Sequence, residues 1–117
     1  MNKNGIIIIG DKMNKIAQII ILDKNYNSQL DDVIVLHESV ELIDEVTIKL
    51  SNKDIYNFDY LIFTSPSLIT NFNETNILHD GGFPVTNYFH QTTYENIYYV
   101  TDDNIEIALN NIFEEDC

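Results

Sequence analysis

The sequence has few of the residues from which redox and phosphate-binding sites are built. Cysteine occurs once, as Cys117, so neither an internal disulfide nor a Cys-x-x-Cys redox pair can form within the chain. Arginine is absent, and glycine occurs only four times. These shortages turn attention from thiol chemistry to packing and charge.

Long apolar runs are also missing. The run Ile6–Ile9 is four residues long and ends at Gly10, which is shorter than the apolar part of a secretory signal. No stretch approaches the roughly 18 apolar residues that a membrane-spanning helix needs. We therefore expect no secretory signal and no membrane segment, and the expected location is cytoplasmic.

Basic residues are few and unevenly distributed. Nineteen acids oppose six lysines, which gives a net charge of −13. Residues 1–53 hold all six lysines and eight acids, a net of −2, whereas residues 54–117 hold eleven acids and no base, a net of −11. Such a surface repels phosphate backbones and anionic lipids, so we expect no direct binding to nucleic acid or membrane. The charge favours either simple solubility or an acidic surface for a basic protein partner, such as a DNA-binding protein.

What the chain does contain predicts one folded domain over residues 1–117. Its apolar fraction of 44% can offset the entropy of ordering, and its length suits one core. Residues 11–18 have room for at most about two helical turns or an elaborate turn. Five short apolar runs predict strands: Ile6–Ile9, Ile19–Leu22, Val33–Leu36, Tyr60–Thr64 and Asn96–Val100.

A hairpin is expected in the middle of the chain. Alternation over Glu41–Leu50 predicts one strand with Val46, Ile48 and Leu50 on one face. The polar stretch Ser51–Asp54 predicts the turn that leads into a second strand.

The second half of the chain combines extended segments with a helix. Residues 55–58 complete the hairpin, residues 69–79 are polar and predict a loop, and Asp80-Gly81-Gly82 predicts a turn into an extended segment, 83–85. Asp102-Asp103-Asn104 supplies the polar start of a helix that runs to about Phe113. Its apolar stripe has helical spacing: Ile105, Ala108, Leu109 and Ile112. The expected fold class is α/β.

Two stretches resemble a known family. Residues 40–65, VELIDEVTIKLSNKDIYNFDYLIFTS, resemble the β-meander and returning strand of FAD-dependent pyridine nucleotide-disulfide oxidoreductases, with Phe63-Thr64-Ser65 in place of the usual A-T-G. Residues 81–103, GGFPVTNYFHQTTYENIYYVTDD, resemble the closing motif of the same family, with Asp102 at its acid. Thioredoxin-reductase-like members are the most similar. The resemblance implies a small Rossmann-like sheet, of the FAD/NAD(P)-binding-domain type, with a β-meander and a C-terminal helix.

The departures from that family bear on function. The family opens with G-x-G-x-x-G, where glycines let the backbone approach a pyrophosphate, but this chain opens with Ile9-Gly10-Asp11 and keeps one glycine. The NAD(P)H-binding domain is absent, and residues 66–80 stand in its place. The resemblance therefore implies a vestigial cofactor site at Gly10, Thr64 and Asp102, no catalytic residues, and no FAD bound in the usual mode.

Other chemistry finds little support in the sequence. His37, His79 and His90 form no i, i+4 pair and no H-E-x-x-H motif, so we expect no metal site. Ser65-Pro66-Ser67 lacks the G-x-S-x-G elbow of nucleophilic serines.

Three functional hypotheses follow from these observations. The first is a non-catalytic, acidic protein-interaction module, regulatory or inhibitory, in which tyrosines among acids serve as interface material. The second is a small redox accessory protein that keeps weak FAD or nucleotide binding and is completed by a partner subunit. A decayed remnant with little function is the third reading. An exposed strand edge also makes a homodimer an open alternative.

Overall fold

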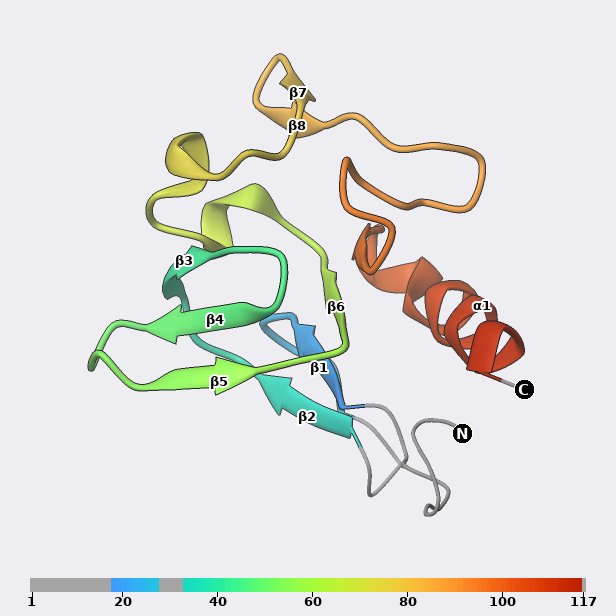
Figure 1. Cartoon of the computed structure of the whole chain (residues 1–117), viewed down its shortest axis with the longest axis horizontal. Helices are drawn as coiled ribbons and strands as arrows, with labels where there is room; N and C mark the ends of the chain where they lie inside the picture. Colours follow the sequence, from blue (N-terminus) through green and yellow to red (C-terminus); the bar gives the residue numbers. More distant parts are fainter. Residues whose placement is uncertain (1–17, 28–32, 117) are drawn as a thin grey trace.

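The computed structural model describes residues 18–27 and 33–116. These residues form a mixed α/β structure with a four-stranded parallel sheet, a three-stranded antiparallel sheet and a two-stranded hairpin, followed by an α-helix. Figure 1 shows the antiparallel sheet on one side of the parallel sheet and the helix on the other. The α/β prediction is therefore confirmed for the described part of the chain.

The parallel sheet has the strand order β2-β1-β6-β9. Its strands are β1 (Ile19–Leu22), β2 (Val33–Leu36), β6 (Tyr60–Phe63) and β9 (Ile97–Tyr99). All four predicted runs in this region form strands. β1 is buried at all four positions because it has a neighbour on each side and apolar layers on both faces.

The helix α1 (Ile105–Asp116) covers one face of the parallel sheet. It follows a 3₁₀ turn, η3 (Asp102–Asn104), which places Asp102 and Asp103 at its amino end as expected. The helix ends at Asp116 and not near Phe113, since no glycine or proline interrupts the final acids. The expected stripe is buried with its neighbours in one cluster: Ile19, Ile21, Ile62, Tyr98, Val100, Ile105, Ala108, Leu109 and Ile112.

A β-meander covers the opposite face. It consists of β3 (Val40–Ile43), β4 (Thr47–Leu50) and β5 (Ile55–Asn57), paired antiparallel in that order. The residues between β4 and β5 form the expected turn, with Lys53 at a φ of 79°. The core on this face joins the meander to the sheet: Ile20, Leu22, Val40, Ile43, Ile48, Phe58, Leu61, Phe63, Ile69, Phe72, Ile77 and Ile97.

The prediction of one strand over Glu41–Leu50 was wrong. Asp44 ends β3 because its Oδ1 accepts hydrogen bonds from the backbone N–H of Val46 at 2.9 Å and of Thr47 at 2.7 Å. This local turn replaces the strand ladder and reverses the chain. Val46 is therefore 54% exposed, whereas Ile48 is fully buried.

The connection from β6 to β9 is more ordered than the predicted loop. It contains η1 (Pro66–Leu68), η2 (Phe72–Glu74), β7 (His79–Asp80) and β8 (Phe83–Pro84). Ile69, Phe72 and Ile77 lie in the meander core, so the first part of this connection packs against the domain. The turn at Asp80-Gly81-Gly82 is confirmed, with Gly81 and Gly82 at φ values of 62° and 85°.

The predicted strand Ile6–Ile9 and the segment 11–18, for which a short helix or a turn was expected, fall on residues outside those described, apart from Gln18. Within the described ranges, the structure has no helix with the length and apolar character needed to cross a bilayer.

Candidate functional site

The carboxyl ends of β1, β6 and β9 lie at one edge of the parallel sheet, where open α/β sheets bind their ligands. Asp23 follows β1, Thr64 follows β6, and Asp102 comes three residues after β9. The structure therefore brings the predicted residues Thr64 and Asp102 to the ends of adjacent strands. Gly10, the third predicted residue, lies outside the described part of the chain.

Asp23 occupies this edge and was not predicted from the sequence. Its side chain is only 5% exposed, and its carboxylate accepts a hydrogen bond from the Thr64 hydroxyl. It also accepts the backbone N–H groups of Asn25 at 2.9 Å and Tyr26 at 2.7 Å. Burial raises the pKa of Asp23, but these hydrogen bonds and the nearby His37 outweigh burial and hold the pKa below its usual range.

The described part of the loop after β1 differs from an anion-binding loop in one respect. An anion-binding loop offers free backbone N–H groups at the end of the strand. Here the carboxylate of Asp23 already accepts two of those groups, and the residues that follow, Lys24 to Asn27, include no glycine. The chain thus carries its own anion at this position.

Asp102 and the serines of this edge lie in short local turns. Asp102 is exposed and begins η3, whose N-cap, Thr101, makes no side-chain capping bond. Ser65 caps the amino end of η1, because its Oγ accepts a hydrogen bond from the backbone N–H of Ser67 at 3.3 Å. The same Oγ lies 2.8 Å from Ser67 Oγ. These hydroxyls form a turn and not a nucleophilic elbow.

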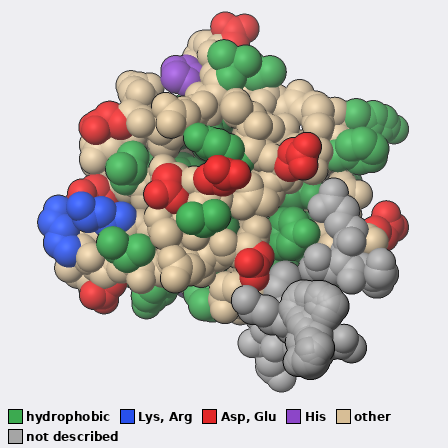
Figure 2. Space-filling view, viewed as in Figure 1, with side chains coloured by type: hydrophobic (Ala, Val, Ile, Leu, Met, Phe, Trp, Pro, Cys, Tyr) green, Lys and Arg blue, Asp and Glu red, His purple; other side chains and the backbone are tan. Residues whose placement is uncertain are grey.

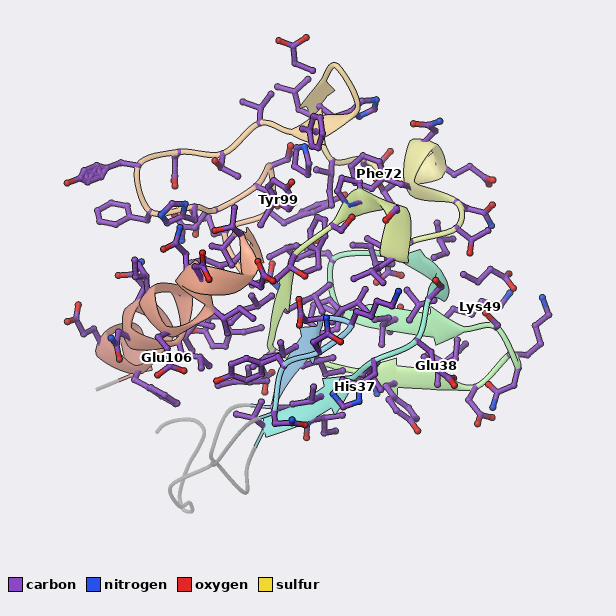
Figure 3. All side chains as sticks on the ribbon, turned by 180° about the vertical axis from the view of Figure 1, so that it is seen from behind. His37, Glu38, Lys49, Phe72, Tyr99 and Glu106 are labelled. Atoms are coloured by element: carbon purple, nitrogen blue, oxygen red, sulfur yellow. The ribbon has the colours of Figure 1, made fainter. Side chains whose placement is uncertain are left out.

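The three histidines lie apart from one another. His37 follows β2 (Figure 3), and its Nε2 lies 2.7 Å from the carbonyl oxygen of Tyr26. The ring centroid of His79 lies 5.3 Å from that of Phe72. His90 adopts a φ of 69° in the loop before β9. Among residues 18–27 and 33–116, no three histidine, cysteine, aspartate or glutamate side chains are grouped as metal ligands would be.

A second candidate site is a tight loop, Asn87–Gln91, which we call the aromatic loop. The side chain of Asn87 organises it: Oδ1 accepts the backbone N–H groups of Phe89 at 2.8 Å and Gln91 at 3.0 Å, and Nδ2 donates to Gln91 Oε1 at 2.8 Å. The backbone closes the loop as well, because Asn87 N donates to Gln91 O and His90 N donates to Asn87 O, both at 3.0 Å. The loop is therefore fixed by its own hydrogen bonds.

The aromatic loop presents two aromatic rings to solvent. Tyr88 is 85% exposed and Phe89 is 55% exposed, and their ring centroids lie 5.4 Å apart. Figure 2 shows hydrophobic side chains projecting at the right of the view, on the side where Figure 1 draws the segment between β8 and β9. Rings held outward in this way cannot contribute to the core.

The aromatic loop is fastened to the rest of the fold on two sides. His90 O accepts the backbone N–H of Tyr99 at 3.0 Å, which joins the loop to β9. Gln91 Nε2 donates a hydrogen bond to Glu95 O, in the segment before β9, at 3.0 Å. Asn111 Nδ2 donates to Phe89 O at 3.5 Å, and this bond joins the loop to α1. Its position is thus set by the sheet and the helix together.

A cavity of about 250 Å³ lies beside the aromatic loop, and the described residues that line it are Phe89, Tyr98, Asn111 and Glu114. Phe89 offers an aromatic surface, Asn111 an amide and Glu114 a carboxylate. This combination suits a cation on an apolar stem, such as a lysine or arginine side chain. The sequence indicated that tyrosines among acids could serve as interface material without indicating which residues face outward, and it gave no sign of Asn111 or Glu114.

Exposed apolar side chains gather in the same connection. Five of the eleven exposed large hydrophobic residues of the described chain fall between residues 78 and 89. Besides the two rings, they are Leu78, Phe83 and Val85, exposed by 63%, 60% and 44%.

The lysines of the β4–β5 hairpin lie in a different part of the molecule from the aromatic loop. Lys49 and Lys53 lie on the hairpin of β4 and β5, where both pair with Glu41, at 3.4 and 2.6 Å. Figure 2 shows basic side chains gathered at one end of the molecule, and Figure 3 shows Lys49 and Glu106 of α1 on opposite sides. The sequence has no base after Lys53, so the aromatic loop and α1 contain no lysine or arginine of their own, and α1 carries the acids Glu106 and Glu114.

Comparison of the chain with protein-family models, with curated proteins and with solved structures finds no match.

Proposed function

We propose that this chain is a non-catalytic protein-binding module whose docking surface is the aromatic loop together with the adjoining cavity. The observation that carries the proposal is Tyr88, which is 85% exposed on a loop fixed by internal hydrogen bonds. A protein gains nothing in stability from holding a large aromatic ring in water, so a rigid loop that does so is best explained by a partner.

The physical case rests on preorganisation. Aromatic side chains contribute large contact areas at a low cost in side-chain entropy, and they are enriched among the residues that dominate binding energies. Since Asn87 already fixes the loop, binding does not have to order its backbone. Tyr88 and Phe89 then act as anchors.

The proposed partner is a basic protein. The chain carries −13 overall, and −11 of this arises after residue 53. A lysine or arginine of the partner enters the cavity, where it contacts the ring of Phe89 and pairs with Glu114. Charge of this kind accelerates encounter and makes binding weaken as salt rises.

The scaffold is proposed to be a degenerate, Rossmann-like relative of the FAD-binding domains of thioredoxin-reductase-like proteins, acting in the cytoplasm. The parallel order β2-β1-β6-β9, the meander before β6 and the helix after β9 support this relationship. The carboxylate of Asp23 at the strand edge supports the loss of the cofactor.

A second candidate function is a weakened nucleotide or flavin site at the same edge, completed by a partner subunit. The observation in its favour is the presence of Thr64 and Asp102 after adjacent parallel strands. A thermal shift with FAD, FMN or NAD(P)H would support this function. An unchanged melting temperature with all of them would contradict it and favour the protein-binding module.

The test of the binding module uses an arginine-rich peptide as a probe. Backbone amide signals are followed by NMR during titration with an alternating arginine–alanine peptide, and the largest shifts are expected at Phe89, Asn111 and Glu114. Glu114→Gln and Phe89→Leu should each weaken binding about tenfold, whereas the matched control Val46→Ser, also at an exposed apolar residue, should not. Shifts spread evenly over the acidic surface, or binding unchanged in both variants, would overturn the proposal.

A further inference from the structure

β5 is the outer strand of the meander, and its other side is not paired by any strand within residues 18–27 and 33–116. All three of its residues are exposed, with Ile55 at 61% and Tyr56 at 38%. Figure 1 shows β5 at the outer side of β4. Such an edge is a template for another strand, and proteins commonly block it with proline or charge. β5 contains neither.

The backbone of β5 points outward at two of its residues. Leu50 N donates to Asp54 O at 2.8 Å, and Phe58 N donates to Val46 O at 2.9 Å, so the backbones of Asp54 and Phe58 face β4. Antiparallel ladders alternate, with every second residue bonded to the same neighbour. The N–H and C=O groups of Ile55 and Asn57 therefore face away from β4 and are in position to bond a further strand.

The charges near β5 favour a second copy of the chain as the partner of this strand edge. Two copies of a chain with a net charge of −13 repel each other over most of their surface. Lys49 and Lys53 both lie on this hairpin, and Figure 3 shows Lys49 on the side of the molecule opposite Glu106 of α1. Since the carboxylates of Glu41 and Asp54 lie beside them, the charges here nearly cancel, and repulsion between copies is weakest at this edge.

We propose that β5 is a homodimer interface, in which two copies pair their β5 strands antiparallel about a two-fold axis at Tyr56. Ile55 of each copy exchanges backbone hydrogen bonds with Asn57 of the other, and the two Tyr56 side chains meet across the axis. Lys53 lies three residues before Tyr56 and Asp59 three residues after it, so the lysine end of each hairpin faces the Asp59 end of the other. The two meanders form one continuous sheet.

The proposed dimer is weak, and its interface leaves the aromatic loop exposed. A strand of three residues buries much less than the roughly 1,200 Å² of a stable specific interface, so association is concentration-dependent. The aromatic loop extends from the connection between β8 and β9, away from the hairpin (Figure 1). A dimer therefore presents two copies of that loop, whether or not the loop binds the proposed partner.

Sedimentation equilibrium over a concentration series at physiological salt tests the interface. The expected result is a monomer–dimer equilibrium whose dissociation constant rises about tenfold or more in Ile55→Pro and in Tyr56→Lys. Ile55→Pro removes an outward N–H that β4 does not use, and Tyr56→Lys sets like charges together at the axis. The control Leu78→Lys adds the same charge on the β7–β8 side and should dimerise as the unmodified chain does.

Circular dichroism first establishes that each variant is folded, which separates a lost interface from a lost fold. A purely monomeric chain over the whole concentration range overturns the proposal. So does a dimer that persists unchanged in Ile55→Pro and Tyr56→Lys, because the two copies must then associate elsewhere.

Discussion

The hydroxyl of Thr64 donates a hydrogen bond to the carboxylate of Asp23 across the ends of two neighbouring strands, 41 residues apart in sequence. This contact closes the edge of the parallel sheet where α/β proteins commonly bind a ligand. The residue expected to mark an old cofactor site thus contributes to the stability of the fold.

Replacing Asp23 should destabilise the fold. Asp23→Ala removes a buried acceptor of three hydrogen bonds and should lower the free energy of unfolding by about 2–3 kcal/mol. Thr64→Val, which removes one donor, should cost about 1 kcal/mol. Urea denaturation measures both, with Asp80→Ala at an exposed turn as the matched control. Equal midpoints for Asp23→Ala and Asp80→Ala would contradict the structural role of Asp23.

Acid should destabilise the chain partly through the same carboxylate. The pKa of Asp23 is lowered in the folded state, so its charged form contributes stability that is present above the unfolded pKa, about 3.9, and is lost as pH falls through the folded pKa. Asp44, whose turn N–H bonds outweigh its burial and lower its pKa, acts in the same direction. In Asp23→Asn, the slope of unfolding free energy against pH should become shallower below about pH 4. An unchanged slope would mean that the charge of Asp23 is not stabilised by folding.

At alkaline pH the relevant pair is Tyr26 and Glu106. The hydroxyl of Tyr26 donates to Glu106 Oε2 at 2.7 Å, which links the loop after β1 to α1. Burial, this hydrogen bond and the charge of Glu106 raise the pKa of Tyr26 to about 12. The neutral phenol thus contributes stability that is present below the unfolded pKa of about 10 and is lost as pH rises from 10 toward 12.

Tyr26→Phe should therefore lower the free energy of unfolding by about 1 kcal/mol at neutral pH. The difference from the unmodified chain should shrink above pH 10, as Tyr26 ionises. Ultraviolet titration of this variant should also lose one late-ionising tyrosine relative to the unmodified chain. Two titration curves of the same shape would show that Tyr26 does not pair with Glu106 in solution.

Asn96 connects the meander with the start of the parallel strands. Its Nδ2 donates to Glu45 O at 2.7 Å and to Asp59 O at 3.1 Å, from a position just before β9. Asn96→Ala should cost about 1–2 kcal/mol, because both carbonyls lose a donor. Thermal unfolding measures the effect, and Asn110→Ala on the exposed side of α1 is the matched control. Hydrogen exchange should also accelerate in β3 and β4 if the meander is released.

The apolar pattern was sufficient to predict most of the fold. Ile19–Leu22, Val33–Leu36 and the core of Tyr60–Thr64 form strands as expected, because short β-branched runs have few other ways to be buried. The stripe containing Ile105 and Ile112 faces the core because its spacing matches the helical period.

The same reasoning failed where a single polar side chain controlled the backbone. Asp44 interrupts an alternating segment, and its turn bonds outweighed the pattern over Glu41–Leu50. The sequence of residues 69–77 is mostly polar, yet Ile69, Phe72 and Ile77 are buried. Their spacing fits no regular element, so the pattern of apolar residues did not predict their burial.

The sequence by itself determined the four strands of the parallel sheet, the helix, the turn between β4 and β5 and the charge asymmetry, since each depends on residues within a few positions of one another. Only the tertiary structure decided that Asp23 would be buried against Thr64, and that Asn87 would hold Tyr88 and Phe89 in solvent beside Asn111 and Glu114. The physical reason is distance along the chain: the burial of a side chain depends on which remote segments pack around it, and local pattern does not carry that information.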